Sequence, residues 1–203
     1  MSKMETLRDD FGSGTINTVK WNDNTGAISI DAGRAKLLRT PSGLVTLAST
    51  NTCDISESYL AAKVTLDSGM LTEQGHILAM NAIIGDGSQN RAGITFSTDS
   101  VGAYTSFSSI ENGTFYAGPK IAYDAVNHSW WRVRESAGTL YWDTSADGIK
   151  WTNRHSRTHS LSTTQLSPWF QTAFGFGGTS SKPVYIDNVN VFPNPAAFLP
   201  FFI

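Results

Sequence analysis

Cysteine is nearly absent from this chain, and its scarcity limits what can hold the fold together. Cys53 is the single cysteine among 203 residues. No intramolecular disulfide can form, and no zinc site can be built from several thiolates. The chain must therefore rely on a hydrophobic core, and it is long enough to bury one. Cys53 itself is expected to be a small buried apolar side chain.

Charged residues are also scarce. They make up 16% of the sequence, against roughly 25% in an average soluble protein. The formal net charge is -2, and Lys and Arg do not gather among aromatic residues. Because phosphate binding needs a basic surface, nucleic acid is excluded as an expected partner. The arginines at 132, 134, 154 and 157 are interpreted as scattered surface charges.

Long apolar runs are missing as well. No stretch reaches the roughly 20 apolar residues that a membrane-spanning helix needs, and residues 1–10 lack the apolar centre of a secretory signal. We therefore expect no membrane partner. The protein is expected to be made in a cytoplasm, where it stays soluble or joins an assembly.

Short alternating segments separated by turn residues are plentiful. Glycine occurs 18 times, and small hydroxyl residues are frequent. Regularly spaced short strands with turn signals are typical of a β-sandwich or barrel. The run 76–84 is almost entirely apolar and could form a buried helix or a strand; the glycines that follow it favour a strand. The polar residues 154–166 are predicted to form a loop.

The segment 123–151 shows the clearest pattern. Two alternating runs flank a turn at 136–138, and a second turn at 145–148 leads into a further run. One face of this predicted three-strand meander holds Trp131, Val133, Leu140 and Trp142. The other face holds Trp130, Arg132, Arg134, Tyr141 and Asp143. Such alternation predicts strands with one buried face, and Trp131 and Trp142 are expected in the core. Residues 169–177 read as a further strand with Phe170, Phe174 and Phe176 on one face, and Phe174 is also expected to be buried.

The same segment resembles the central hairpin of concanavalin A-like (laminin G-like) jelly rolls, in the version found in bacteriophage virion proteins. The residues that carry the likeness are His-Ser-Trp-Trp-Arg-Val-Arg-Glu at 128–135 and Gly-Thr-Leu-Tyr-Trp-Asp at 138–143. Residues 8–37 resemble the family's opening strands, and 184–191 its closing strand. The resemblance implies one all-β domain over 1–192, an antiparallel β-sandwich with its last strand beside its first. Because the fold hosts lectins, glycanases and structural modules, function must be argued from sites.

Catalysis is not expected. Glycanases of this fold carry Glu-x-Asp-x-x-Glu on one strand, which places two carboxylates about 5 Å apart on one face. The glutamates of this chain fall in no such pattern: Glu5, Glu57, Glu73, Glu111 and Glu135. His155 and His159 lie in the polar stretch and are expected to be solvated. The sequence therefore predicts a protein that is not an enzyme.

The charged and aromatic face of the meander is the candidate sugar-binding site. Trp130 and Tyr141 would provide aromatic platforms, and Arg132 and Asp143 planar polar groups, a combination that suits pyranose rings. The alternative is structural: Arg132 pairs with Asp143 across the strands, and the aromatic rings pack under a second layer.

A calcium site is a further implication of the resemblance. Domains of this fold often bind Ca²⁺ through carboxylates and carbonyl groups near the opening and closing strands. The corresponding acids here are Asp9, Asp10 and Asp187. No other cofactor is expected.

The C-terminal segment 193–203 differs from the rest of the chain. Pro193 and Pro195 end the last predicted strand, and 196–203 are almost entirely apolar. The large side chains are Phe198, Leu199, Phe201, Phe202 and Ile203. A free tail of this kind would invite aggregation. It can fold back on its own sandwich or dock on another chain, and the two prolines favour docking on a second copy or on another protein.

Together these features predict a non-enzymatic accessory protein of a bacteriophage virion, either a capsid decoration or a minor tail component. It would assemble in the host cytoplasm, reside in the virion and have the capacity to bind host-surface glycans. The alternative is a free-standing carbohydrate-binding lectin, followed by a degenerate glycan hydrolase.

Deletion of residues 196–203 tests the docking role of the tail. Burial of each large apolar side chain is worth roughly 1.5–3 kcal/mol. If the tail docks on another chain, the truncated protein should keep its melting temperature and no longer join particles or oligomers. Calorimetry measures the melting temperature, and co-sedimentation measures the assembly. A loss of several degrees, or normal assembly, would place the tail in the domain's own core.

Overall fold

A computed structural model of the whole chain describes residues 1–38, 44–72, 76–84, 89–174 and 182–193; for 76–84 and 173–174 it describes the backbone only. The residues that are predicted to dock, 196–203, lie outside this part. No helix in the described part of the chain has the length and apolar character needed to cross a bilayer.

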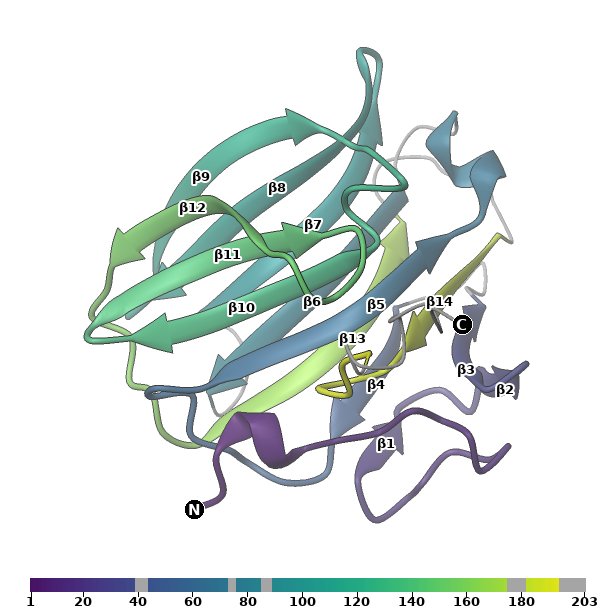
Figure 1. Cartoon of the computed structure of the whole chain (residues 1–203), viewed down its shortest axis with the longest axis horizontal. Helices are drawn as coiled ribbons and strands as arrows, with labels where there is room; N and C mark the ends of the chain where they lie inside the picture. The colour runs from purple at the N-terminus through teal and green to yellow at the C-terminus, as the bar shows by residue number, and fades with distance from the viewer. Residues whose placement is uncertain (39–43, 73–75, 85–88, 175–181, 194–203) are drawn as a thin grey trace, which may run out of the picture.

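The fold is an all-β sandwich of two antiparallel seven-stranded sheets (Figure 1). The first sheet has the order β1 (Trp21–Asp23), β4 (Val45–Ser49), β13 (Leu166–Phe174), β6 (His76–Ile84), β7 (Arg91–Asp99), β8 (Gly102–Glu111) and β9 (Thr114–Ala122). The second has the order β12 (Thr152–Thr158), β11 (Thr139–Ser145), β10 (Trp130–Ser136), β5 (Tyr59–Leu66), β14 (Pro183–Asp187), β3 (Arg34–Leu38) and β2 (Ile28–Asp31). The described residues also form two short 3-10 helices, η1 (Met4–Thr6) and η2 (Ser68–Leu71).

The predicted hairpin is present, and its turn has a simple cause. β10 and β11 pair from Trp130 with Ser145 to Ser136 with Thr139. Ala137 and Gly138 join them with φ of 49° and 75°, the left-handed conformation that two-residue hairpin turns require. The apolar run 76–84 forms β6, as predicted.

The core lies between the two sheets, where the inward faces of their strands meet. Trp131 and Trp142, predicted to be buried, are 0% exposed. Phe96 and Phe107 of the first sheet are buried as well. The side chain of Phe174, also predicted to be buried, lies outside the described part. Large buried aromatic side chains therefore come from both sheets, as the alternation predicted.

Two terminal segments cover the outer face of the second sheet near β5 and β10. Asn190 accepts a bond from the Ala61 N–H and donates to the carbonyl of Met4. Asp9 forms an isolated antiparallel bridge with Val189, so the chain after the last strand lies beside the opening segment. Phe192 packs on Trp130, with 6.2 Å between ring centroids. Trp130 is consequently only 3% exposed.

Polar side chains fill the edge of the sandwich where β9 and β12 approach each other. The prediction of a loop at 154–166 is wrong for its first part, because β12 extends to Thr158. His155 stacks on Trp142, and the side chain of His159 is 4% exposed, so neither is the solvated loop residue that was expected. Arg157 binds Glu111 across the two sheets. The polar composition of 154–166 suggested a loop, but the side chains of His155, Arg157 and His159 close an edge of the sandwich instead of facing water.

Trp142 tests the core. Truncation to Ala should cost about 3–5 kcal/mol, since the cavity cannot be filled by neighbours. Within the described part of the chain the indole Nε1 has no hydrogen-bond partner, so Trp142→Phe keeps a smaller aromatic ring and removes an unpaired donor, and it should be milder. Urea unfolding measures both. An unchanged midpoint for Trp142→Ala would contradict the position of this residue in the core.

Trp130 tests the covering layer. Because its ring lies under Phe192, Trp130→Ala should lower the free energy of unfolding by about 3 kcal/mol. Tyr141, half-buried on the same face, contributes one contact with Arg134, so Tyr141→Ala should cost only about 1 kcal/mol. Equal effects in urea titrations would show that Phe192 does not shield Trp130.

Candidate functional site

The outer face of the first sheet presents small side chains on two neighbouring strands. The outward positions of β7 and β8, read from the alternation of buried residues and the register, include Gly93, Thr95, Ser97, Ser106 and Ser108. Hydroxyl groups therefore dominate this strip, and no large side chain rises from its centre. Sugar hydroxyls bind well to such donors and acceptors.

Trp169 is a large aromatic residue on the same face of the sheet, with β6 between it and this strip. It occupies an outward position on β13 and is half-buried. The register links it through the backbone of Asn81 to Gly93 and then to Ser108. Two strand spacings separate Trp169 from Gly93, roughly 10 Å. Gly93 has no side chain and is itself buried, and Asn81 of β6 holds the position between it and Trp169.

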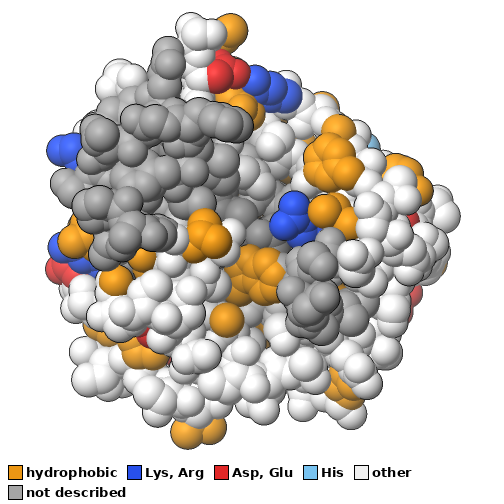
Figure 2. Space-filling model, turned by 180° about the vertical axis from the view of Figure 1, so that it is seen from behind, with side chains coloured by type: hydrophobic (Ala, Val, Ile, Leu, Met, Phe, Trp, Pro, Cys, Tyr) orange, Lys and Arg blue, Asp and Glu red, His pale blue; other side chains and the backbone are white. Residues whose placement is uncertain are grey.

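Charged and apolar side chains border the strip on this face. Figure 2 shows the face with hydrophobic groups gathered near its middle and a basic side chain beside them. Arg91 begins β7 on the outward side and pairs in register with Ile110. Phe115, opposite Ile110 on the edge strand β9, is 59% exposed. The face therefore combines aromatic, hydroxyl and basic groups.

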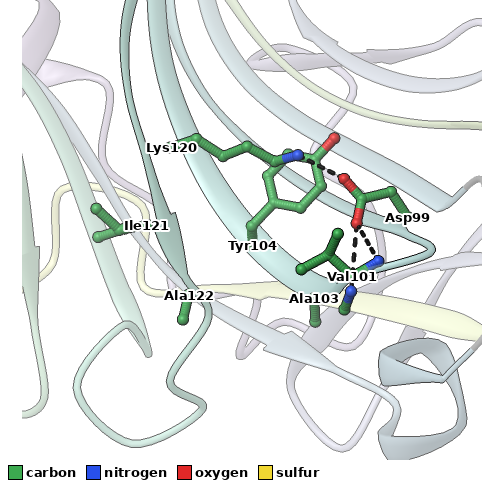
Figure 3. Close-up of a pocket in the computed structure, with 8 residues that line it drawn as sticks. Asp99, Val101, Ala103, Tyr104, Lys120, Ile121 and Ala122 are labelled. Atoms are coloured by element: carbon green, nitrogen blue, oxygen red, sulfur yellow. Dashed lines mark hydrogen bonds and ion pairs between the residues drawn. The ribbon is translucent and has the colours of Figure 1, made fainter.

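A pocket of about 260 Å³ lies at one end of the strip, where the β7–β8 hairpin meets the end of β9 (Figure 3). Lys120 extends over the ring of Tyr104, with Nζ 3.4 Å from the ring centroid, and binds the carboxylate of Asp99. The apolar lining residues are Val101, Ala103, Ile121 and Ala122. The volume is slightly below the roughly 300 Å³ where ligand pockets usually begin, so it suits one small ring.

The Asp99–Lys120 pair sets the electrostatics of this pocket. The hydrogen bond from Lys120 lowers the pKa of Asp99, and the same bond raises the pKa of Lys120. Asp99 also accepts bonds from the N–H groups of Val101 and Gly102. Both groups are thus charged at neutral pH. An exposed pair of this kind adds little stability, so breaking it to bind a ligand would cost the fold little.

Acidic side chains are few on the described strands of the first sheet. The strands of the first sheet contain three acids: Asp23, Asp99 and Glu111. Glu111 points into the sandwich, 2% exposed, and accepts bonds from Arg157, Ser109 and Ser160. Among the described side chains, Asp99 is therefore the one acid on the outward side of β7 and β8. A general acid and a nucleophile on one face need two.

The sugar site predicted from the sequence lies on the opposite face, on the second sheet. Trp130 is buried under Phe192, and Asp143 is 1% exposed. Arg132 binds Asp143 across the strands, with Nη2 2.8 Å from Oδ2, as the structural alternative predicted. Arg132 and Tyr141 are half-buried. Two of the four predicted residues thus have internal roles and present little surface to a sugar.

The acids that the resemblance assigns to calcium have other bonds. Asp9 accepts the N–H of Phe11 and the indole Nε1–H of Trp21, both at 2.9 Å. Burial raises the pKa of Asp187, and the nearby charge of Asp10 adds to the rise. Within the described part, no three His, Cys, Asp or Glu side chains gather to hold a metal. Ca²⁺ takes six to eight oxygen ligands, so a site here would also need carbonyl or water oxygens, and calcium binding stays a prediction.

Sequence reasoning missed Trp169 and Gly93. Alternation along 169–177 placed phenylalanines on one face, and Trp169 occupies the other. A glycine within a predicted strand is a signal of close backbone approach, and Gly93 provides it. What could not be read from the sequence is that register places Gly93 and Trp169 in one cross-strand row.

Comparisons with known proteins locate the fold among carbohydrate-active and carbohydrate-binding β-sandwiches. No protein-family model matches the sequence, and no curated protein does. An endo-acting O-glycanase described from the human gut microbiota aligns with a TM-score of 0.68 and 10% identity, over 92% of this chain and 98% of that one. A CBM2 module of the evolved Dit protein of Lactobacillus casei BL23 phage J-1 aligns with a TM-score of 0.58 and 11% identity, over 92% and 96%.

Xylan β-1,4-xylosidase from Bacillus halodurans C-125 aligns with a TM-score of 0.64 and 12% identity, over 89% of this chain. The chain spans 38% of the length of that enzyme. At such identities the likeness concerns the fold alone. The chain thus has the concanavalin A-like β-sandwich architecture that the sequence predicted.

Proposed function

We propose that the protein is a non-catalytic glycan-binding β-sandwich that holds its ligand on the outer face of the first sheet. The observation that carries the proposal is half-buried Trp169 on the outward side of β13, in a cross-strand row that continues through Asn81 to Gly93 and Ser108. A partly exposed aromatic ring is a natural platform for the apolar face of a pyranose.

The surroundings of this row supply polar contacts for a sugar. Ser106 and Ser108 lie beside it and offer hydroxyl donors and acceptors. The pocket with Tyr104 and Lys120 lies four residues further along β8. Strand geometry places it roughly 20 Å from Trp169. A short oligosaccharide, rather than a single sugar, therefore matches the face.

The distribution of acids supports a role without catalysis. Asp99 is bound to Lys120, and Glu111 is enclosed in the sandwich. A retaining or inverting mechanism needs two carboxylates that flank one glycosidic bond. We infer that the protein binds glycans and does not cleave them. A degenerate glycan hydrolase remains the third interpretation.

Within this role we propose an accessory protein of a bacteriophage virion, either a capsid decoration or a minor tail component. The module of the phage J-1 Dit protein has a similar fold, and the apolar segment 196–203 offers a means of attachment. The alternative is a free-standing lectin. Association of the full-length protein with purified particles supports the virion role, and its absence from them leaves the lectin.

Glycan binding is tested on an oligosaccharide array followed by calorimetric titration of the strongest ligand. The wild-type protein should bind, and Trp169→Ala should weaken binding at least about tenfold, since loss of an aromatic platform costs about 1–3 kcal/mol. Tyr185→Ala is the matched control, because Tyr185 is a half-buried aromatic residue of the second sheet. No ligand for the wild type, or equal losses in both variants, would refute the site.

A further inference from the structure

Two arginines of β10 share one buried carboxylate on the outer face of the second sheet. Arg132 reaches Oδ2 of Asp143 through Nε at 2.9 Å and Nη2 at 2.8 Å. Arg134 reaches the same oxygen through Nε at 2.9 Å. Asn153 donates to Oδ1 at 2.9 Å. Two positive charges thus meet one negative charge, and both oxygens of that carboxylate are occupied.

Each guanidinium is also held by an aromatic ring. Arg132 lies over Trp151, with Cζ 4.2 Å from the ring centroid, and Arg134 lies over Tyr141 at 3.8 Å. The side chains of Arg132 and Arg134 are 19% and 31% exposed. Stacking fixes the plane of a guanidinium and leaves its edge free to donate. The two groups are therefore positioned in advance for a further acceptor.

Within the described part of the chain, neither arginine forms an ion pair with a second acid. Glu57 binds Ser136 and the Ala137 N–H, and Glu5 binds Ser58. The cluster of two arginines and one carboxylate therefore keeps a net positive charge.

We propose that this arginine pair binds the carboxylate of an acidic sugar. A planar carboxylate matches the fork of a guanidinium, and such charge-assisted bonds are the strong ones. Tyr141, in the register position opposite Arg134, holds the guanidinium of Arg134 in a fixed plane. The site lies on the opposite face from Trp169. Loss of glycan binding at the first sheet would therefore leave this proposal standing, and a failure of this proposal would leave the first-sheet site standing.

The proposal is tested by titrating the protein with sodium glucuronate. NMR follows the Nε–Hε resonances of Arg132 and Arg134 during the titration. At constant ionic strength these resonances should shift saturably, and glucose should leave them unchanged. Arg134→Gln should weaken binding about tenfold, the value of one charge-assisted bond. Arg134→Lys, which keeps the charge and loses the fork, should bind with intermediate affinity. Circular dichroism verifies that the variants are folded.

Arg34→Gln is the matched control. Arg34 also stacks on a tyrosine of the second sheet, 4.1 Å from the ring centroid of Tyr185, so this variant removes the same charge and the same kind of contact. It should bind glucuronate as the wild type does. Equal losses in the two Gln variants would reduce the effect to net charge and overturn the proposal, as would the absence of a saturable shift. If glucose 6-sulfate saturated the shift and glucuronate did not, the group bound would be a sulfate ester, and the proposal of a carboxylate would be wrong.

Discussion

The packing of the two inner sheet faces against each other is the constraint on which the rest of this structure depends. Trp131 and Trp142 from one sheet and Phe96 and Phe107 from the other are excluded from water. Since side chains alternate along a strand, a shift of one residue would turn these rings outward. The same constraint therefore decides which residues face outward, including Trp169 and Gly93 on one side and the arginine pair on the other.

Buried charges, whether inside the sandwich or on its outer face, are satisfied locally, and that requirement accounts for many of the polar residues. Asp143 and Glu111 are almost completely buried, yet each accepts several bonds from arginine, asparagine or serine. An unpaired buried carboxylate would cost several kcal/mol. Polar residues that looked like loop or catalytic candidates in the sequence thus close the edges and faces of the sandwich.

The predicted sugar site shows where reasoning from alternation stops. The pattern correctly placed Trp130, Arg132, Tyr141 and Asp143 on one face of the hairpin. It could not reveal that Phe192, more than 40 residues away in the chain, covers Trp130. Alternation distinguishes the two faces of a strand, but it does not tell whether a later segment shields the outer face.

The sequence by itself determined the all-β class, the hairpin at 130–145 and the burial of Trp131 and Trp142, because these follow from period-two alternation and turn residues nearby in the chain. It also showed that no acid pattern for glycoside hydrolysis is present. Only the tertiary structure decided which outward residues become neighbours. Gly93 and Trp169 are far apart in the chain, and strand order and register alone bring them into one row.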